Sequence, residues 1–130
     1  MKIKKVINIE DTILKHVAIK RELESEGIRL IVLADNAEKG IKEIEQAEVA
    51  GEPYDLLVCD MHFNFFGKDD TEAGEKTLKH LREKGIKLPV VFCSSQNWQI
   101  QGSIGTVFYN EQRYWEQDMR EMIKKVEAIL

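Results

Sequence analysis

Short apolar runs alternate with longer helical stretches along almost the whole of this chain, and this alternation limits the folds open to it. The runs are too short to be helices and are predicted as strands at residues 5–9, 28–33, 56–59, 90–93 and 105–109. Apolar runs that are separated by helices indicate a parallel sheet covered by helices on both faces. The chain is therefore expected to be an α/β protein.

Glycines mark the ends of two of the helical stretches. Residues 12–26 lead to Gly27 and residues 71–84 lead to Gly85, and glycine is common just beyond a helix end. Asn36 precedes another helical stretch and is expected to cap its first turn. The last helix has the most regular pattern, with these apolar residues on one face: Trp115, Met119, Met122, Val126 and Ile129.

One helix of the regular alternation is short or missing. Between Ser94 and Gly105 the chain is too short for a full helix, so residues 96–101 are predicted as a loop or a single turn. Right-handed crossovers between parallel strands favour a doubly wound sheet of five strands in the order 2-1-3-4-5. With 130 residues, the whole chain (1–130) fits a single domain of this kind.

The composition narrows the functional classes. The formal net charge of −4 indicates no general attraction to nucleic acid or to an anionic membrane surface. No apolar run approaches the length of a transmembrane helix, and the N-terminal residues lack the apolar stretch of a secretory signal. Cys59 and Cys93 both lie within apolar runs, as buried thiols do in a reducing compartment. We therefore expect a cytoplasmic protein that binds neither nucleic acid nor membrane.

Acidic residues follow the first and third predicted strands. Glu10 and Asp11 come directly after the first, Asp60 ends the third, and Ser94 ends the fourth. In the expected order the first and third strands are neighbours, about 4.8 Å apart, and ligands bind at the carboxyl ends of such strands. Three carboxylates held together repel one another unless a cation joins them. A hard divalent ion with oxygen ligands, most simply Mg²⁺, meets that requirement.

These features resemble those of a known family. The receiver domains of two-component response regulators have an acidic pair after the first strand, a phosphoacceptor aspartate after the third, and a Ser or Thr after the fourth. Glu10 and Asp11 match the acidic pair. Residues 56–60 (Leu-Leu-Val-Cys-Asp) match the phosphoacceptor strand, and residues 89–94 (Pro-Val-Val-Phe-Cys-Ser) match the hydroxyl strand. The resemblance covers essentially the whole chain and lies in the order and spacing of these motifs.

The resemblance implies a specific chemistry. Asp60 would accept a phosphoryl group from a phosphohistidine of a sensor histidine kinase or a phosphotransfer protein. Mg²⁺ would be bound by Glu10, Asp11 and Asp60, with the backbone carbonyl of His62 as a further ligand. Ser94 would hydrogen-bond to a phosphoryl oxygen. The chain would then signal through a downstream protein target, as an atypical single-domain receiver in a phosphorelay and not as an enzyme.

The chain departs from the family at two further places that bear on signalling. The family has a lysine after the fifth strand, where this chain has Tyr109 or Asn110, and nothing cationic replaces it at that position. Lys68 or Arg113 would have to reach in from a loop. The loop after the third strand, residues 62–70, lacks the family's proline and is several residues longer.

Two other functions remain open. One is a pseudo-receiver, an adaptor regulated by protein binding without phosphorylation, which the missing lysine and the missing fourth helix favour. The other is a Mg²⁺-dependent phosphoryl hydrolase with Asp60 as nucleophile, but His62 stands where such an enzyme needs a second carboxylate. The intact acidic residues and Ser94 favour the phosphorylatable receiver.

Several aromatic and histidine residues fall outside these motifs. Phe63, Phe65 and Phe66 form a docking surface, a lid over the acidic cleft or a part of the core, of which we favour the core. His16 and His80 lie on predicted helices, and we expect both to be solvated.

Overall fold

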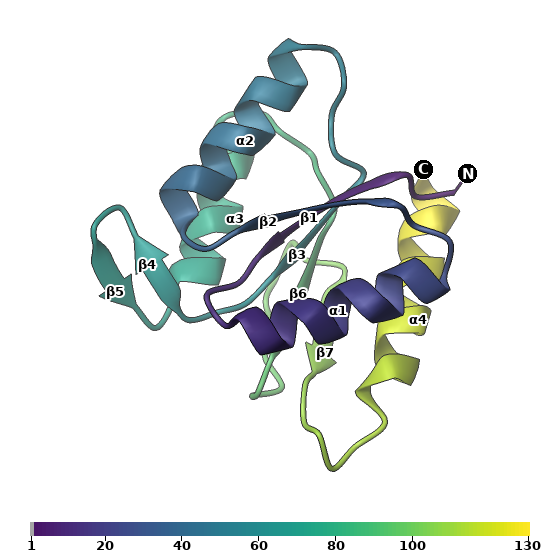
Figure 1. The fold of residues 1–130 in the computed structure, drawn as a ribbon. Helices are drawn as coiled ribbons and strands as arrows, with labels where there is room; N and C mark the ends of the chain where they lie inside the picture. The colour runs from purple at the N-terminus through teal and green to yellow at the C-terminus, as the bar shows by residue number, and fades with distance from the viewer. Residues whose placement is uncertain (1) are drawn as a thin grey trace.

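A five-stranded parallel sheet forms the centre of the protein (Figure 1), whose computed structural model describes residues 2–130. Its strands are β1 Lys5–Ile9, β2 Leu30–Ala34, β3 Leu56–Cys59, β6 Val90–Ser94 and β7 Gly105–Phe108. They lie in the order β2-β1-β3-β6-β7, and every neighbouring pair is parallel. Numbered within this sheet alone, the order is 2-1-3-4-5, so the predicted topology is confirmed.

Helices cover both faces of the sheet. They are α1 Ile13–Ser25, α2 Ala37–Val49, α3 Ala73–Glu83 and α4 Trp115–Ile129. Figure 1 shows α2 and α3 on one face and α1 and α4 on the other. Side chains of β1 alternate between two buried clusters, with Ile7 and Ile9 under α2 and α3 and Val6 under α1 and α4. None of the helices described is long and apolar enough to cross a membrane.

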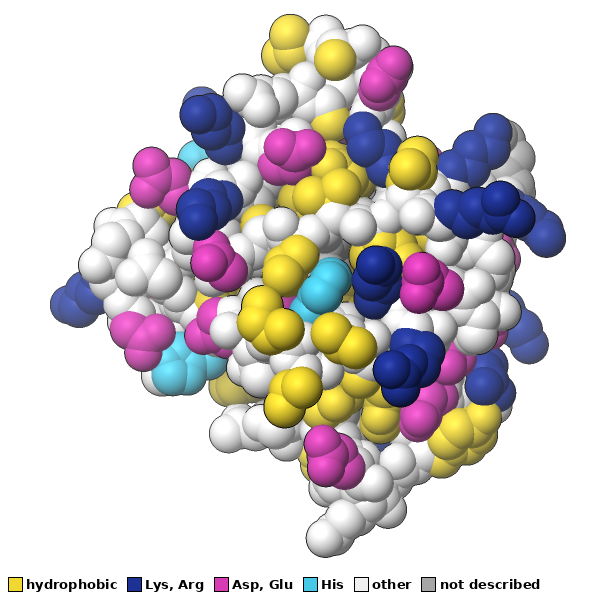
Figure 2. Space-filling view, in the orientation of Figure 1, with side chains coloured by type: hydrophobic (Ala, Val, Ile, Leu, Met, Phe, Trp, Pro, Cys, Tyr) yellow, Lys and Arg dark blue, Asp and Glu magenta, His cyan; other side chains and the backbone are white. Residues whose placement is uncertain are grey.

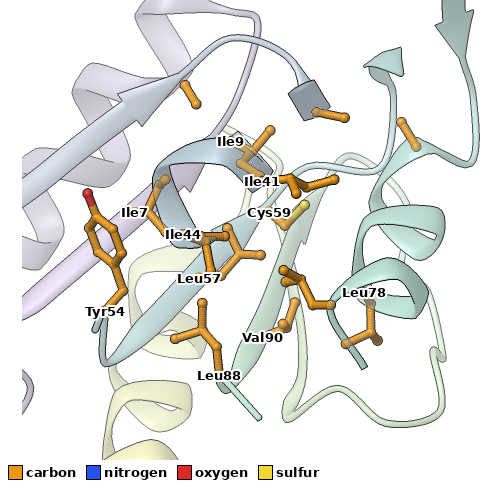
Figure 3. Close-up of a cluster of buried hydrophobic side chains, with 14 of the residues drawn as sticks. Ile7, Ile9, Ile41, Ile44, Tyr54, Leu57, Cys59, Leu78, Leu88 and Val90 are labelled. Atoms are coloured by element: carbon orange, nitrogen blue, oxygen red, sulfur yellow. The ribbon is translucent and has the colours of Figure 1, made fainter. Parts of the chain in front are cut away.

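The cluster under α2 and α3 fixes that face of the sheet. Figure 3 shows Ile41 and Ile44 of α2 and Leu78 of α3 around Leu57 and Val90 of the sheet. All five side chains are buried. Full burial of one aliphatic side chain of this size contributes about 1.5–3 kcal/mol to the stability of the folded state. The strands are therefore held in register, and so are the polar residues at their carboxyl ends.

The segment after β3 contains a hairpin where the sequence predicted a loop. Its antiparallel strands are β4 Phe63–Phe65 and β5 Lys68–Asp70. Phe66 and Gly67 between them have φ angles of 53° and 94°, and positive φ at both positions is the geometry of a tight hairpin turn. The side chain of Asn64 accepts a hydrogen bond from the N–H of Gly67 at 2.8 Å.

The phenylalanines of this hairpin have different surroundings. Phe63 is fully buried in the cluster under α2 and α3, and Phe65 packs partly against the same cluster, so the core prediction is confirmed for these two. Phe66 is 51% exposed at the turn, where its ring lies 6.4 Å from the ring of half-buried His80.

The chain between β6 and β7 contains no helix in the structure described, as the sequence predicted. Trp98 and Ile100 of this segment pack partly against the cluster under α2 and α3. The hydroxyl of Thr106 donates a hydrogen bond to the carbonyl of Trp98 at 2.8 Å, which ties the segment to β7.

Helix α1 presents apolar side chains to solvent as well as to the sheet. Ile19 and Leu23 are fully buried, whereas Ile13, Leu14 and Val17 are 59%, 82% and 42% exposed. Figure 2 shows hydrophobic side chains gathered on the surface over this helix. The uneven apolar pattern of residues 12–26 therefore reflects two faces, one of which is not covered by this chain.

Candidate functional site

Carboxylates from the ends of β1 and β3 lie together at the carboxyl edge of the sheet. The two strands pair so that Ile9 lies opposite Cys59, which brings the residues that follow them side by side. One oxygen each from Glu10, Asp11 and Asp60 lies within 4.8 Å of the others. This is the convergence that the strand order led us to expect.

The carboxylates line a cleft of about 570 Å³ at this edge. Its other walls come from the first turn of α1, from the ends of β6 and β7, and from the segments that follow β3 and β6. Besides the carboxylates, the residues that bear on its chemistry are Lys15, His62, Ser94, Trp98 and Tyr109.

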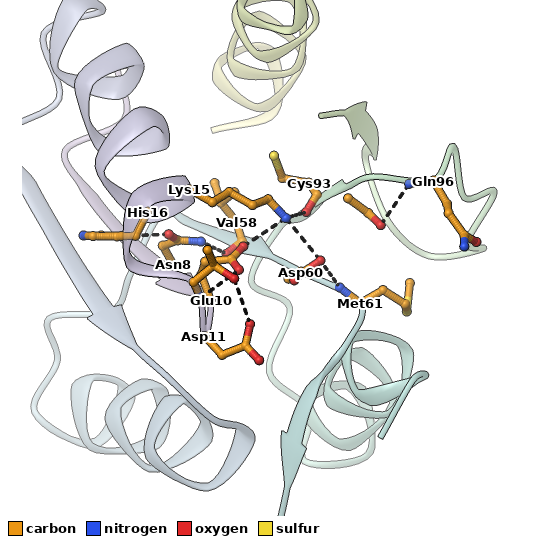
Figure 4. A network of polar contacts seen from close by, with 12 residues as sticks. Asn8, Glu10, Asp11, Lys15, His16, Val58, Asp60, Met61, Cys93 and Gln96 are labelled. Carbon is orange, nitrogen blue, oxygen red and sulfur yellow. Dashed lines mark hydrogen bonds and ion pairs between the residues drawn. The ribbon is translucent and has the colours of Figure 1, made fainter. Parts of the chain in front are cut away.

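A lysine on α1, which the sequence analysis did not single out, reaches into this cleft (Figure 4). The Nζ of Lys15 lies 3.0 Å from Oε1 of Glu10 and 3.2 Å from Oδ1 of Asp60. The same atom donates a hydrogen bond to the carbonyl of Cys93 at 2.7 Å. The cleft therefore contains a cation, although this cation comes from α1 and not from the position after β7.

The two loop cations considered from the sequence lie elsewhere. Lys68 is exposed on β5. The Nη1 of Arg113 pairs with Asp118 at 3.0 Å and donates to the carbonyl of Phe108 at 2.8 Å. The ring of Tyr109, just beyond β7, instead lies 5.4 Å from the Nζ of Lys15, so an aromatic face borders the ammonium on that side.

Helix geometry explains why Lys15 reaches the cleft. It lies one turn before Ile19 and two turns before Leu23, so it belongs to the buried face of α1. Helical side chains tilt toward the helix N-terminus, and here that end faces the carboxyl edge of the sheet. The side chain of Lys15 is 12% exposed. The spacing from Ile19 and Leu23 is the signal in the sequence, but it locates Lys15 only once this face of α1 is known to be the buried one.

The Lys15 ammonium is stabilised by its surroundings. Burial alone lowers its pKa, but three acidic groups together outweigh that effect: the Cys93 thiol, which has a pKa of about 12 and is charged only in strong base, and the carboxylates of Asp60 and Glu10. The net result is a pKa above the ordinary value of a lysine, so the group is charged at neutral pH.

Glu10 is fully buried at the bottom of the site. Its Oε2 accepts a hydrogen bond from the N–H of Thr12 at 3.2 Å. Its Oε1 has no hydrogen bond of good geometry within residues 2–130, although Lys15 is close. Burial is the main cause that raises the pKa of the Glu10 carboxyl to about 7. The positive charge of Lys15 lowers this pKa, and the negative charge of Asp60 raises it further. A carboxyl held in this way has an oxygen available for a further cation.

Asp60 has one oxygen held in place and one available. Its Oδ1 accepts a hydrogen bond from the N–H of Met61 at 2.8 Å and faces the Lys15 ammonium. Among the described residues, no hydrogen bond or ion pair involves its Oδ2. The side chain is 15% exposed, so the group lies at the wall of the cleft and is not sealed in the core.

Ser94 is positioned by the segment that replaces the missing helix. Its Oγ accepts hydrogen bonds from the indole Nε1 of Trp98 at 3.1 Å and from the N–H of Gln96 at 3.3 Å. Two accepted bonds leave the hydroxyl proton to be donated into the cleft. Trp98 was not predicted as a residue of the site, and no pattern in the sequence marks it as the residue that orients Ser94.

His62 forms its side-chain contact with the hairpin. Its Nε2 lies 2.8 Å from Oδ2 of Asp69, and this hydrogen bond is the main cause of a raised pKa for His62, whose imidazole is exposed. The backbone carbonyl of His62 as a metal ligand stays a prediction.

His16 has a structural contact that the sequence analysis did not expect. Its Nδ1 lies 2.8 Å from Oδ1 of Asn8, a fully buried residue of β1 whose Nδ2 donates to the carbonyl of Val58 at 2.9 Å. The expectation that His16 is simply solvated is wrong, because its ring satisfies a buried amide.

No family model and no curated protein matches the chain, but solved structures match its fold. The receiver domain of the Francisella response regulator 1452 is 19% identical with a TM-score of 0.70, over 98% of this chain and 99% of that one. The N-terminal domain of a response regulator/sensory box/GGDEF three-domain protein from Carboxydothermus hydrogenoformans is 19% identical with a TM-score of 0.71, over 97% of this chain and 95% of that one. The receiver domain of the histidine kinase CKI1 from Arabidopsis thaliana, complexed with Mg²⁺ and BeF₃⁻, is 16% identical with a TM-score of 0.67, over 96% of this chain and 90% of that one. The chain therefore has the fold of the receiver domains of response regulators and histidine kinases.

Proposed function

We propose that this chain is a phosphoacceptor receiver module of a two-component phosphorelay, which accepts a phosphoryl group on Asp60 and signals through a partner protein. The observation that carries the proposal is the convergence of Glu10, Asp11, Asp60 and Ser94 at one cleft at the carboxyl edge of the sheet. A nucleophilic carboxylate, metal-type ligands and a hydroxyl donor are the groups that phosphoryl transfer to an aspartate requires.

The donor set fits Mg²⁺. The three carboxylates supply oxygens within 4.8 Å of one another, and Oε1 of buried Glu10 has no hydrogen bond of good geometry within the part of the chain described. Glu10, Asp11 and Asp60 would hold the ion together with the backbone carbonyl of His62, and retained waters would complete its preferred six oxygen ligands. When bound, Mg²⁺ offsets negative charge on the transferring phosphoryl group.

The residues of the chain have separate parts in the transfer. The N–H of Met61 holds Oδ1 of Asp60, which leaves Oδ2 to form a bond to phosphorus. The bond from phosphorus to the donor breaks at the same time, and its electron pair leaves with the donor. The leaving group is acetate from acetyl phosphate or, after it gains a proton, imidazole from a phosphohistidine. The hydroxyl of Ser94 would donate a hydrogen bond to a phosphoryl oxygen.

The donor would be a sensor histidine kinase or a phosphotransfer protein in the cytoplasm. Similarity in fold to receiver domains of a response regulator and of a histidine kinase supports this class of partner. The output would be a protein target, because a net charge of −4 gives no general attraction to nucleic acid or to anionic membranes. The module would act by changing its binding surface, as a signalling component and not as an enzyme.

Intact mass spectrometry after incubation with acetyl phosphate and Mg²⁺ tests the proposal. The wild-type chain should gain the mass of one phosphoryl group, and Asp60→Asn should gain none. Asp69→Asn, which changes an exposed aspartate of the hairpin, is the matched control and should be modified like the wild type. An unmodified wild-type mass under forcing conditions would leave the pseudo-receiver adaptor as the function.

A further inference from the structure

The position of Lys15 conflicts with local helix preferences. It lies in the first turn of α1, which contains no acidic residue and whose N-cap, Thr12, makes no capping bond through its side chain. The N-terminus of a helix carries partial positive charge, so a cation there is disfavoured. A long polar side chain on the buried face of a helix is also unfavourable unless it is paired. Contacts outside the helix must therefore hold Lys15 in place.

Those contacts surround the ammonium with three oxygens. A lysine has three N–H donors, and the three oxygens near Nζ belong to Glu10, Asp60 and the Cys93 backbone. The oxygens come from the ends of three adjacent strands, β1, β3 and β6. The ammonium therefore lies within the cleft, next to Oδ1 of Asp60, the oxygen that also accepts the hydrogen bond from Met61.

We propose that Lys15 is the phosphoryl-binding cation of this site, supplied by the first turn of α1 and not by a residue that follows β7. The inference rests on the proposed function of Asp60. Before phosphorylation the ammonium pairs with the Asp60 carboxylate, and after phosphorylation it pairs with a phosphoryl oxygen on the same side chain. Ser94 donates from β6, so α1 and the end of β6 hold the group between them.

The same placement makes Lys15 a competitor for a divalent cation. Its charge lies 3.0 Å from Glu10 and 3.2 Å from Asp60, two of the three carboxylates that would bind Mg²⁺. Removal of this charge should strengthen binding of a cation and weaken binding of an anionic phosphoryl mimic. A purely structural role for Lys15 would weaken both, because a disordered site binds neither ligand well.

Binding of Mg²⁺ alone, and of BeF₃⁻ in saturating Mg²⁺, provides the test. Calorimetry measures the first, and ¹⁹F NMR of the fluoride complex measures the second. In Lys15→Gln, Mg²⁺ should bind at least about threefold more tightly, because a competing positive charge is removed. BeF₃⁻ should bind about tenfold more weakly, which is the effect expected for loss of one charge-assisted hydrogen bond. Lys20→Gln, which changes an exposed lysine of the same helix, should leave both affinities unchanged. Lys15→Arg keeps the charge and should restore most of the BeF₃⁻ affinity.

Loss of Lys15 leaves two carboxylates without their cation, so a second comparison guards against misfolding. The double variant Glu10→Gln/Lys15→Gln removes opposite charges together, and it should bind BeF₃⁻ about tenfold more weakly than Glu10→Gln alone. Equal BeF₃⁻ affinities in that comparison, or Mg²⁺ and BeF₃⁻ affinities that fall together in Lys15→Gln, would overturn the role of Lys15. A wild-type chain that takes neither BeF₃⁻ nor a phosphoryl group would instead overturn the proposed function.

Discussion

The buried carboxyl of Glu10 should make the stability of the metal-free protein depend on pH. Its pKa is raised from 4.5 to about 7, chiefly by burial, so the folded state holds a proton that the unfolded state releases. The contribution of Glu10 to stability is therefore fully present below pH 4.5 and is lost as the pH rises through 7. Urea unfolding between pH 4.5 and 8 in the presence of a chelator should show Glu10→Gln gaining stability relative to the wild type as the pH rises. Parallel curves for the two proteins would contradict the raised pKa, and Glu24→Gln, at an exposed position, is the control.

Trp98 should set the affinity for a phosphoryl mimic through its contact with Ser94. Replacement by phenylalanine keeps the aromatic packing but removes the indole N–H that lies 3.1 Å from the Ser94 hydroxyl oxygen. Loss of one neutral hydrogen bond corresponds to about 0.5–1.5 kcal/mol. Titration of Trp98→Phe with BeF₃⁻ in Mg²⁺, followed by ¹⁹F NMR, should show a severalfold weaker affinity. Trp115→Phe, on the far side of Tyr109, should bind like the wild type, and an equal loss in both variants would contradict this account.

Most of the candidate site could be predicted from residues at strand ends, while its cation could not. Glu10, Asp60 and Ser94 directly follow or end apolar runs, and the topology of a parallel sheet brings such residues to one edge. Lys15 lies on a helix whose apolar residues occupy two faces, so the sequence did not show which face is buried. The cations considered from the sequence, Lys68 and Arg113, lie in segments after the third and fifth strands of the sheet, whereas Lys15 lies on the helix that follows the first strand.

At the scale of elements, the close approach of α3 to the chain after β3 should make Gly74 sensitive to substitution. A Cβ at Gly74 would clash with the backbone carbonyl of Asp60 and lie 3.0 Å from the Cα of Met61. Alanine in a helix is ordinarily favoured over glycine by about 1 kcal/mol. Here overpacking should outweigh the helix preference for alanine, so that Gly74→Ala lowers the free energy of unfolding by about 1–3 kcal/mol. Equilibrium unfolding in urea measures this change. Gly105→Ala is the control and should lose less stability, because its Cβ meets the flexible side chain of Met122. A Gly74→Ala protein as stable as the wild type would refute the clash.

The elements predicted correctly are those in which local signals and burial agree. Asn36 caps α2 through a hydrogen bond from the N–H of Lys39 at 2.9 Å, as its position before a helical stretch indicated. The hairpin of β4 and β5 was missed because its turn places Phe66 at positive φ, where glycine or asparagine is the usual residue. Burial of Phe63 under α2 and α3 compensates for this local conflict. A core position was expected for Phe63, but nothing in the sequence indicated the hairpin that places it there.

At the scale of the whole molecule, Mg²⁺ should stabilise the fold through the acidic cleft. An ion that binds only the folded state raises the melting temperature by mass action. Asp11→Asn should reduce this rise in a thermal melt at millimolar Mg²⁺. The metal-free variant should melt close to the wild type, because Asp11 is exposed and the Lys15 ammonium contacts the other two carboxylates. An undiminished Mg²⁺ effect would show that Asp11 is not a ligand, and Asp35→Asn at an exposed site is the control.

A phosphoryl mimic on Asp60 should change α1 and the segment between β6 and β7 more than it changes α4. A ligand shifts a conformational equilibrium only through contacts that differ between the two states, and the expected contacts are those of Lys15 and Ser94. Backbone amide shifts between Mg²⁺ alone and Mg²⁺ with BeF₃⁻ should therefore be largest around these residues and around Asp60.

The ion pairs between α1 and α4 are expected to transmit only a small response. The Nε of Arg120 lies 2.8 Å from Glu22 and 3.5 Å from Glu26, two to three turns along α1 from Lys15. The Arg120 side chain is 37% exposed, and partly exposed ion pairs of this kind couple elements by about 1 kcal/mol or less. Amide shifts along α4 should accordingly be small, and Arg120→Gln should leave the shifts in α1 unchanged. Shifts along the buried face of α4 as large as those beside Lys15 would mean that the response runs through Tyr109 and β7, and that α1 is not the element that carries the signal.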